Sequence, residues 1–244
     1  TSVPDIYAVG DAVEVTHFVT RQKALISLAG PANKQGRIAA DNICGGNSHY
    51  HGSQGSSVLK LFGLTAAFTG INEKTARAAG IAYDKVVLFP ASHAAYYPGA
   101  QSMAMKVLYE KESLRLLGAQ IVGGDGVDKR IDVLATAIRA KMTALELTEL
   151  DLSYAPPYSS AKDPVNMAGF MIEDLESGKV RQFHWNDVED LPCDGSATLL
   201  DVRTAWEYQR GHLDGFRNIP LDDLREYLDE LDRGKPVYVN CQTG

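Results

Sequence analysis

Two strand candidates and an amphipathic helix follow one another directly near the middle of the chain, and they restrict the fold more than any other feature. Met103–Tyr109 and Leu114–Val122 are largely apolar, and a polar Lys-Glu pair between them predicts a turn and hence an antiparallel hairpin. Apolar residues then recur at helical spacing from Val127 to Met142. A hairpin followed by a helix with one apolar face predicts an α+β domain.

Further elements are predicted on both sides of this hairpin, and they suggest four regions. The predicted strands are Ile6–Val9, Val58–Phe62, Lys85–Phe89, Thr198–Val202 and Pro236–Asn240, and the predicted helices are Pro31–Ile43, Asn72–Ala79 and Asp222–Leu231. The regions are residues 1–52, 53–158, a connecting helix and linker over 159–180, and 181–244. Short alternating strands and helices in the last region predict an α/β unit.

Charge and cysteine content exclude several classes of function. The 244 residues carry a formal net charge of −7 without any block of Lys or Arg, which argues against a nucleic-acid or anionic-membrane partner. No apolar run reaches the roughly 20 residues that a membrane helix needs. Three widely spaced cysteines do not form a disulfide framework, so a cytoplasmic location is predicted. The chain begins without an initiator Met, and we expect it to be part of a longer sequence.

The first motif lies at the N-terminus, where an apolar segment ends in Gly10 and Asp11. Glycine lets the backbone approach a ligand, and an acid at the end of a strand accepts hydrogen bonds from sugar hydroxyls. The simpler interpretation is a strand followed by a turn. The string Thr1–Asp11, however, resembles the second FAD-binding motif of the pyridine nucleotide–disulfide oxidoreductases. That resemblance implies that Asp11 binds the ribityl chain of FAD, with Gly10 and Ala12 beside the cofactor.

The predicted helix after Gly30 fits the same resemblance. Its N-terminus would point at the pyrimidine end of the flavin, where the positive end of the helix dipole stabilises negative charge. The contacts implied are Leu28, Ala29, Pro31, Ala32 and Asn33. In this family the first FAD motif, the nicotinamide-binding fingerprint and the redox-active cysteine all lie upstream. No G-x-G-x-x-G occurs in these residues, so NAD(P)H and most of the CoA site are expected upstream.

The second motif consists of tyrosines in residues 53–158, which resemble the dimerisation domain of the same family and imply a homodimer. The segments Ser92–Gly99 and Ser153–Ser159 are similar to the CoA-disulfide reductase and NADH oxidase branch. There, tyrosines of one subunit reach the partner's active site, where a phenol can donate a hydrogen bond or a proton to a leaving thiolate. The resemblance assigns this role to Tyr96 and Tyr154, with their neighbours Tyr97 and Tyr158 as alternatives. A purely structural role, in which these tyrosines pack an interface, is the competing interpretation.

The third motif is a strand that ends in Asn240-Cys241, preceded by Leu199–Arg203 and Gly211–Gly215. This arrangement resembles the rhodanese homology domain, in which backbone N–H groups converge on a cysteine and hold a persulfide. Cys241 is accordingly the candidate sulfur carrier, whereas Asp201, Arg203, Glu207 and His212 are interpreted as structural. Only Gln242, Thr243 and Gly244 follow the cysteine, so we expect its loop to be incomplete.

Together these motifs predict the end of an FAD-binding Rossmann-type domain, an α+β dimerisation domain and a partial α/β rhodanese-like domain. The resemblance implies an FAD-dependent NAD(P)H oxidoreductase that reduces CoA disulfide, CoA persulfide or polysulfide. The alternatives are an oxygen-reducing NADH oxidase, a stand-alone sulfurtransferase and, for the isolated chain, a non-catalytic dimerisation module with negligible bound flavin. His49 and His51 have no further ligands close in sequence, and no metal site is predicted.

Overall fold

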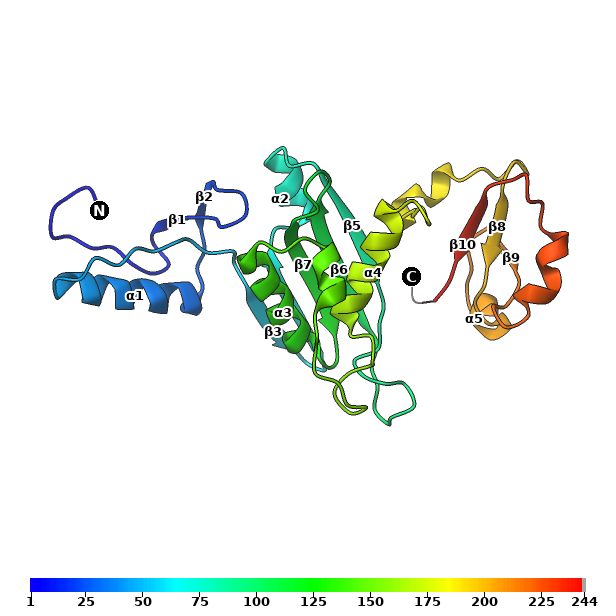
Figure 1. Cartoon of the computed structure of the whole chain (residues 1–244), viewed down its shortest axis with the longest axis horizontal. Helices are drawn as coiled ribbons and strands as arrows, with labels where there is room; N and C mark the ends of the chain where they lie inside the picture. The colour runs from blue at the N-terminus through cyan, green and yellow to red at the C-terminus, as the bar shows by residue number, and fades with distance from the viewer. Residues whose placement is uncertain (243–244) are drawn as a thin grey trace. The chain divides into compact units, whose positions relative to one another are not determined.

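The computed structural model describes residues 1–242, which form two compact units divided between Ser177 and Gly178 (Figure 1). The first unit contains a five-stranded sheet with helices, and the second contains a three-stranded sheet. None of the helices in the described range has both the length and the apolar character needed to cross a membrane. Each unit is built around its own sheet and is described separately below.

The sheet of the first unit is antiparallel throughout, with the order β3-β4-β7-β6-β5. Its strands are β3 (Ser57–Leu61), β4 (Leu64–Gly70), β5 (Tyr83–Leu88), β6 (Met103–Glu110) and β7 (Leu116–Gly123). The predicted hairpin is therefore present as β6 and β7 at the centre of the sheet. The strand β4 was not among the predicted ones; two adjacent alanines and a terminal glycine weaken its strand signal.

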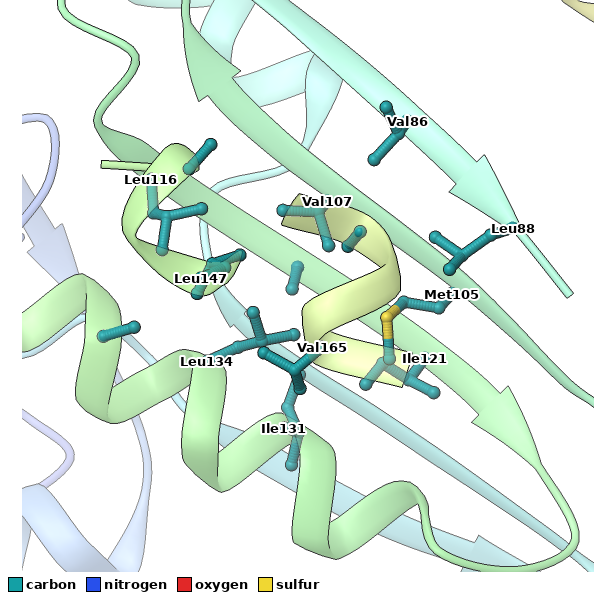
Figure 2. Packing of buried hydrophobic residues seen from close by; sticks show 14 of the residues in the cluster. Val86, Leu88, Met105, Val107, Leu116, Ile121, Ile131, Leu134, Leu147 and Val165 are labelled. Carbon is teal, nitrogen blue, oxygen red and sulfur yellow. The ribbon is translucent and has the colours of Figure 1, made fainter. Parts of the chain in front are cut away.

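Two long helices cover one face of this sheet and close the core (Figure 2). In α3 (Val127–Ala140), Ile131 and Leu134 point into the cluster, and α4 (Pro164–Glu176) contributes Val165. Strand residues such as Val107 and Ile121 meet them from the sheet, and all five side chains are almost fully buried. The apolar spacing that predicted α3 is thus the spacing of its buried side chains.

The structure differs from the sequence-based expectation for residues 159–180, which were interpreted as a connecting helix and linker. Most of this segment is α4, and its Val165, Ala168 and Ile172 belong to the main hydrophobic core. The helix begins sharply because Asp163 caps it, accepting a hydrogen bond from the Val165 N–H, and Pro164 occupies its first position. Apolar residues three to four positions apart bury this helix, so it is an integral layer of the first unit.

The other face of the sheet carries large apolar side chains that α3 and α4 do not cover. Register pairs place Leu59, Leu61, Leu64, Phe68 and Val122 on it, and each is more than two-fifths exposed. Scattered apolar residues are normal on a surface, but five neighbours on one sheet face form a patch. This uncovered sheet face is a candidate contact surface.

The N-terminal part of the first unit consists of β1 (Glu14–Thr16), β2 (Lys23–Leu25) and α1 (Ala29–Ile43). The predicted strand at Ile6–Val9 is wrong, because these residues have no regular structure and are exposed. A strand exists only when it pairs with another, and β1 pairs with β2 rather than with residues 6–9. The predicted helix Pro31–Ile43 is present and begins two residues earlier.

The second unit has a parallel sheet of order β10-β8-β9. Its elements are η2 (Trp185–Asp190), β8 (Thr198–Asp201), α5 (Ala205–Gln209), β9 (Arg217–Asn218), η3 (Leu224–Glu230) and β10 (Val237–Asn240). The strands predicted at Thr198–Val202 and Pro236–Asn240 are present. The helix predicted at Asp222–Leu231 is a shorter 3-10 helix, none of whose residues is buried.

Two more helical segments complete the first unit: α2 (Glu73–Ala78) and the 3-10 helix η1 (Leu145–Glu149). The most buried charged side chain of the first unit is Arg130 on α3, which is 1% exposed. Its guanidinium forms a salt bridge of 3.0 Å with Asp163 at the start of α4. Burying two charges is costly unless both are fully hydrogen-bonded, and removing one of them leaves the other unpaired.

Replacing Arg130 by Met should therefore destabilise the first unit by about 3–5 kcal/mol, because Asp163 would remain buried without its partner. Urea denaturation followed by circular dichroism measures this loss. Both tryptophans, Trp185 and Trp206, belong to the second unit, so their fluorescence provides a separate readout for it.

The matched control for this prediction is Lys129→Met. Lys129 lies 3.6 Å from the same carboxylate, but its side chain is 34% exposed, so we expect a loss below about 1 kcal/mol. Equal losses of unfolding free energy in the two variants would show that burial of the Arg130–Asp163 pair is not the reason for the destabilisation.

Candidate functional site

The segment around Gly10 is held against α1 by one hydrogen bond. The Gly10 N–H donates to the buried Gln35 Oε1 at 2.8 Å, and Gly10 adopts a positive φ of 89° that favours glycine. A side chain at Gly10 would meet no atom within 4 Å in the described part of the chain, and Asp11 and Ala12 beside it are exposed. The structure thus presents the Asp11 carboxylate on an open surface, tied to α1 through its neighbour.

The N-terminus of α1 is also open. Leu28 precedes the helix without capping it by a side chain, and the first turn holds no acidic residue within the described range. Among the contacts predicted there, Ala29 and Asn33 are exposed, and Leu28, Pro31 and Ala32 are half-buried. Unpaired N–H groups at the start of a 15-residue helix favour a negatively charged group.

A wide hollow of about 930 Å³ adjoins the start of α1. Gly30, Pro31 and Lys34 line one wall, and Asp132 and Arg139 of α3 line another. His49 and His51 also border the hollow, but no group of three or more His, Cys, Asp or Glu residues among 1–242 is arranged to hold a metal ion.

Tyr96 and Tyr154 meet although 58 residues separate them in the chain. Their hydroxyl oxygens are 3.1 Å apart, and either can donate the hydrogen bond. The side chains are 77% and 46% exposed, so both phenols face solvent. The hydrogen bond with Tyr96, followed by partial desolvation, raises the pKa of Tyr154 above its ordinary value.

The two alternative tyrosines lie differently. Tyr97 packs edge-on against the ring of His93 at a centroid distance of 5.7 Å, and His93 itself is buried with Nδ1 3.1 Å from the Ala94 carbonyl oxygen. Tyr158 is exposed, and its backbone N–H donates to the Ala155 carbonyl. Tyr96 and Tyr97 therefore differ in their partners: the hydroxyl of Tyr96 contacts that of Tyr154, whereas the ring of Tyr97 packs against His93.

Cys241 follows directly after β10 in the second unit and is exposed. Asn240 and Asp201 are register partners at the carboxyl ends of two parallel strands, and Asn240 Nδ2 donates to Asp201 Oδ2 at 3.2 Å. Binding and reactive groups collect at such strand ends in α/β folds. Two further residues predicted to belong to this loop, Thr243 and Gly244, lie outside the described residues.

The polar residues around this strand end form a connected network. Arg203 donates to the fully buried Asp201 at 2.6 Å and to the Gly211 carbonyl at 2.9 Å. Thr204 and Glu207 form a capping box at the start of α5, and His212 Nδ1 lies 3.0 Å from the Tyr208 carbonyl oxygen. Burial opposes ionisation of Asp201, but hydrogen bonds from Arg203 and Asn240 outweigh it and lower its pKa.

Sequence reasoning did not identify two residues that position these groups, Gln35 and Arg130. Gln35 is a polar residue on the buried side of α1, and Arg130 lies three residues after Val127 and four before Leu134. Both residues could have been found from the sequence, because each is a polar or charged residue on the buried side of a helix.

Two family models match the chain in succession. Residues 57–164 match the pyridine nucleotide-disulphide oxidoreductase dimerisation domain, and residues 184–244 match the rhodanese-like domain. A coenzyme A disulfide reductase of Staphylococcus haemolyticus is 39% identical over 176 residues, which cover 72% of this chain and 40% of that relative.

Two solved structures are similar over nearly the whole chain. Reduced CoADR-RHD of Bacillus anthracis has a TM-score of 0.91 and 48% identity, covering 99% of this chain and 43% of that one. The NAD-dependent persulfide reductase of A. fulgidus has a TM-score of 0.90 and 40% identity, covering 98% and 43%. The chain thus spans about two-fifths of the length of these relatives. Residues 57–164 thus correspond to the pyridine nucleotide-disulphide oxidoreductase dimerisation domain, and residues 184–244 correspond to the rhodanese-like domain.

Proposed function

We propose that this chain forms part of an FAD-dependent NAD(P)H oxidoreductase that reduces CoA disulfide or CoA persulfide, with a rhodanese-like unit that carries persulfide sulfur. The observation that carries the proposal is the exposed hydroxyl pair of Tyr96 and Tyr154 in a dimerisation domain of this family. The printed names of the similar proteins supply the substrate class.

The reactions balance with NAD(P)H as the electron donor. CoA disulfide, NAD(P)H and one proton give two CoA thiols and NAD(P)⁺. CoA persulfide, NAD(P)H and one proton give CoA thiol, hydrogen sulfide and NAD(P)⁺. In both reactions a sulfur–sulfur bond breaks and a thiolate or hydrosulfide leaves, so a hydrogen-bond donor near the departing sulfur stabilises developing negative charge.

The residues near the N-terminus fit FAD in two respects. Asp11 is an exposed carboxylate that can accept hydrogen bonds from sugar-like hydroxyls, and the uncapped start of α1 can face a negatively charged ring edge. Asp11, with Gly10 and Ala12 beside it, and residues Leu28, Ala29, Pro31, Ala32 and Asn33 at the helix start, would hold the cofactor. Bound FAD supplies the transfer of two electrons from NAD(P)H to a disulfide.

The tyrosines act on the leaving sulfur in this proposal. One phenol donates its hydrogen bond to the departing CoA thiolate, and the other orients the first through the 3.1 Å contact. Both rings are exposed on their own protomer, which suits a site completed by a second copy of the chain. A homodimer through residues 53–158 is therefore part of the proposal, and the uncovered sheet face offers apolar surface that an assembly can bury.

Cys241 would carry sulfur in the second unit. Its thiolate attacks the outer sulfur of CoA persulfide, forming a cysteine persulfide and releasing CoA thiolate, so the transfer itself is redox-neutral. The network of Asp201, Arg203 and Asn240 holds the strand end from which Cys241 projects. A cytoplasmic location is also part of the proposal, as are domain limits of 1–52, 53–158 and 181–244, with the helix in residues 159–180 packed on the core of the first unit.

Tyr154→Phe in the intact enzyme should lower kcat for CoA disulfide by about 100-fold, because it removes a donor to the leaving thiolate. NAD(P)H oxidation with an artificial one-electron acceptor should be unchanged, since that reaction has no leaving thiolate. Tyr97→Phe is the matched control, because it keeps the ring contact with His93. NAD(P)H oxidation with oxygen alone, independent of CoA disulfide, would replace the proposal by an oxidase.

Tyr96→Phe should move the alkaline limb of the kcat profile to lower pH. The hydrogen bond with Tyr96 raises the pKa of Tyr154 above its ordinary value, so the wild-type phenol keeps its proton to higher pH. Without Tyr96 the pKa returns toward that value, and the donor ionises earlier as pH rises. An alkaline limb in the same position for both proteins would contradict the coupling of the two hydroxyls.

Cys241→Ser should abolish persulfide formation on the second unit. Intact-protein mass spectrometry after incubation with CoA persulfide should show the gain of one sulfur atom in the wild type and not in this variant. Cys193→Ser is the control, because Cys193 is also exposed, in the turn after η2. Sulfur retained on Cys241→Ser but lost from Cys193→Ser would reassign the carrier.

A further inference from the structure

The two tyrosines that meet come from two separate loops. Tyr96 lies in residues 89–102 between β5 and β6, and Tyr154 lies in residues 150–163 between η1 and α4. One backbone contact links the loops directly, since the Ala94 N–H donates to the Ser159 carbonyl at 3.0 Å. The phenol rings themselves are exposed, so the bases of the loops must set the distance between the hydroxyls.

A single guanidinium hydrogen-bonds to both loop bases. Arg130 Nη2 donates to the Ser92 carbonyl at 2.9 Å in the first loop. The same nitrogen donates to the Ser159 hydroxyl at 3.1 Å and to the Tyr158 carbonyl at 3.4 Å in the second. Ser92 lies four residues before Tyr96, and Tyr158 lies four residues after Tyr154.

Asp163 holds the guanidinium in this place. Its carboxylate accepts from Arg130 at 3.0 Å and from the Ser159 hydroxyl at 2.7 Å, and it also caps α4. Burial opposes its ionisation, but hydrogen bonds from the Val165 N–H and Ser159, together with the charge of Arg130, lower its pKa. The carboxylate therefore stays ionised and keeps the ion pair intact throughout the neutral range.

The backbone of α3 is also shaped around this side chain. Gly126, just before α3, has a positive φ of 70°, and its carbonyl accepts from Arg130 Nη1 at 3.1 Å. A Cβ atom at Gly126 would lie 2.2 Å from that nitrogen. Only glycine leaves room for the guanidinium there while adopting this conformation without strain.

Stability alone does not account for such an arrangement. A buried ion pair is on average no more stabilising than well-packed apolar residues of the same volume. Arg130 lies on the apolar stripe of α3, where Val127 and Leu134 pack into the core. Its distinguishing property is the planar fork, which reaches acceptors from two loops at once.

We infer that Arg130, held by Asp163, is a positioning residue that sets the separation of the Tyr96 and Tyr154 hydroxyls. The inference rests on the proposed role of this pair at the leaving sulfur and extends it to a buried residue that does not touch substrate. Displacing either loop base by about 1 Å breaks the contact between the hydroxyls and costs up to about 100-fold in rate.

Ser159→Ala and Arg130→Lys test the inference in the intact enzyme. Ser159→Ala removes one bridge and leaves the ion pair, whereas Arg130→Lys keeps the charge but lacks the fork. Both should lower kcat for CoA disulfide by about tenfold and leave turnover of the artificial acceptor unchanged. Both should also move the alkaline limb of kcat to lower pH, as in Tyr96→Phe.

The double variants separate positioning from general destabilisation. In a Tyr154→Phe background, Ser159→Ala should cost no more than about twofold in kcat, because the group it positions is already absent. Glu73→Gln is the control for stability: it removes a partner of Lys85 and Lys106 on neighbouring strands and should leave kcat unchanged.

Oxidative dityrosine cross-linking gives a readout that does not depend on catalysis. The peptides containing Tyr96 and Tyr154 should cross-link in the wild type and in Glu73→Gln, and several-fold less in Ser159→Ala and Arg130→Lys. Unchanged cross-linking and kcat in both variants would overturn the inference, as would equal losses with and without Tyr154. Full activity of Tyr154→Phe with cross-linking that still depends on Arg130 would overturn the proposed function alone.

Discussion

The salt bridge between Arg130 and Asp163 is the buried polar contact that joins two helices and two loops of the first unit. It connects α3, which covers the sheet, to the first turn of α4, and it reaches carbonyls in two loops on the way. Loops run over the surface and have few apolar contacts to hold them in place. A buried guanidinium with several N–H donors can hold them instead, by hydrogen-bonding to their backbone carbonyls. The apolar core holds the sheet and helices together, and this ion pair ties the bases of the two loops to them.

The second unit uses the same device beside its candidate cysteine. Asp201 is fully buried at the end of β8, and Arg203 binds it while donating to the Gly211 carbonyl in the following loop. In each unit an arginine spans from a buried aspartate to a backbone carbonyl of a loop. Exposed tyrosines and an exposed thiol thus gain defined positions from pairs that solvent does not screen.

Much of the sheet and its helices could be predicted because their apolar residues follow the periods of strands and helices. The central hairpin and α3 are the clearest cases, since their buried residues are those that the pattern selected. Two strands were predicted wrongly or missed because strand formation depends on pairing. Residues 6–9 have the composition of a strand but pair with no strand in the described chain, whereas β4 pairs on both sides despite a weak pattern. Composition describes how a segment can fold, whereas the available neighbour determines whether it does.

The candidate residues show the same division. The turn residues of Tyr-Tyr-Pro-Gly and Tyr-Ala-Pro-Pro-Tyr predict loops, whereas the tyrosines themselves were singled out by their resemblance to those of the CoA-disulfide reductase and NADH oxidase branch. The hydrogen bond between Tyr96 and Tyr154, across 58 residues of chain, could not be predicted from the sequence. Arg130 was missed because the helix was predicted from its apolar residues alone, and a charged residue among them was given no role. The structure shows the acceptors that surround its guanidinium.

The raised pKa of Tyr154 also bears on what a tyrosine pair can do for a leaving thiolate. An ordinary thiol has a pKa of about 8.5, and the phenol of Tyr154, whose pKa is raised above its ordinary value, is a weaker acid, so full proton transfer to a thiolate is unfavourable. A donor that keeps its own proton is nevertheless well suited to hydrogen-bond the developing anion. The hydrogen bond with Tyr96 is the main cause of that raised pKa, so the second hydroxyl helps the first to keep its proton. The pair is therefore better matched to electrostatic stabilisation of the departing sulfur than to general acid catalysis, and the proton that completes the thiol comes from water.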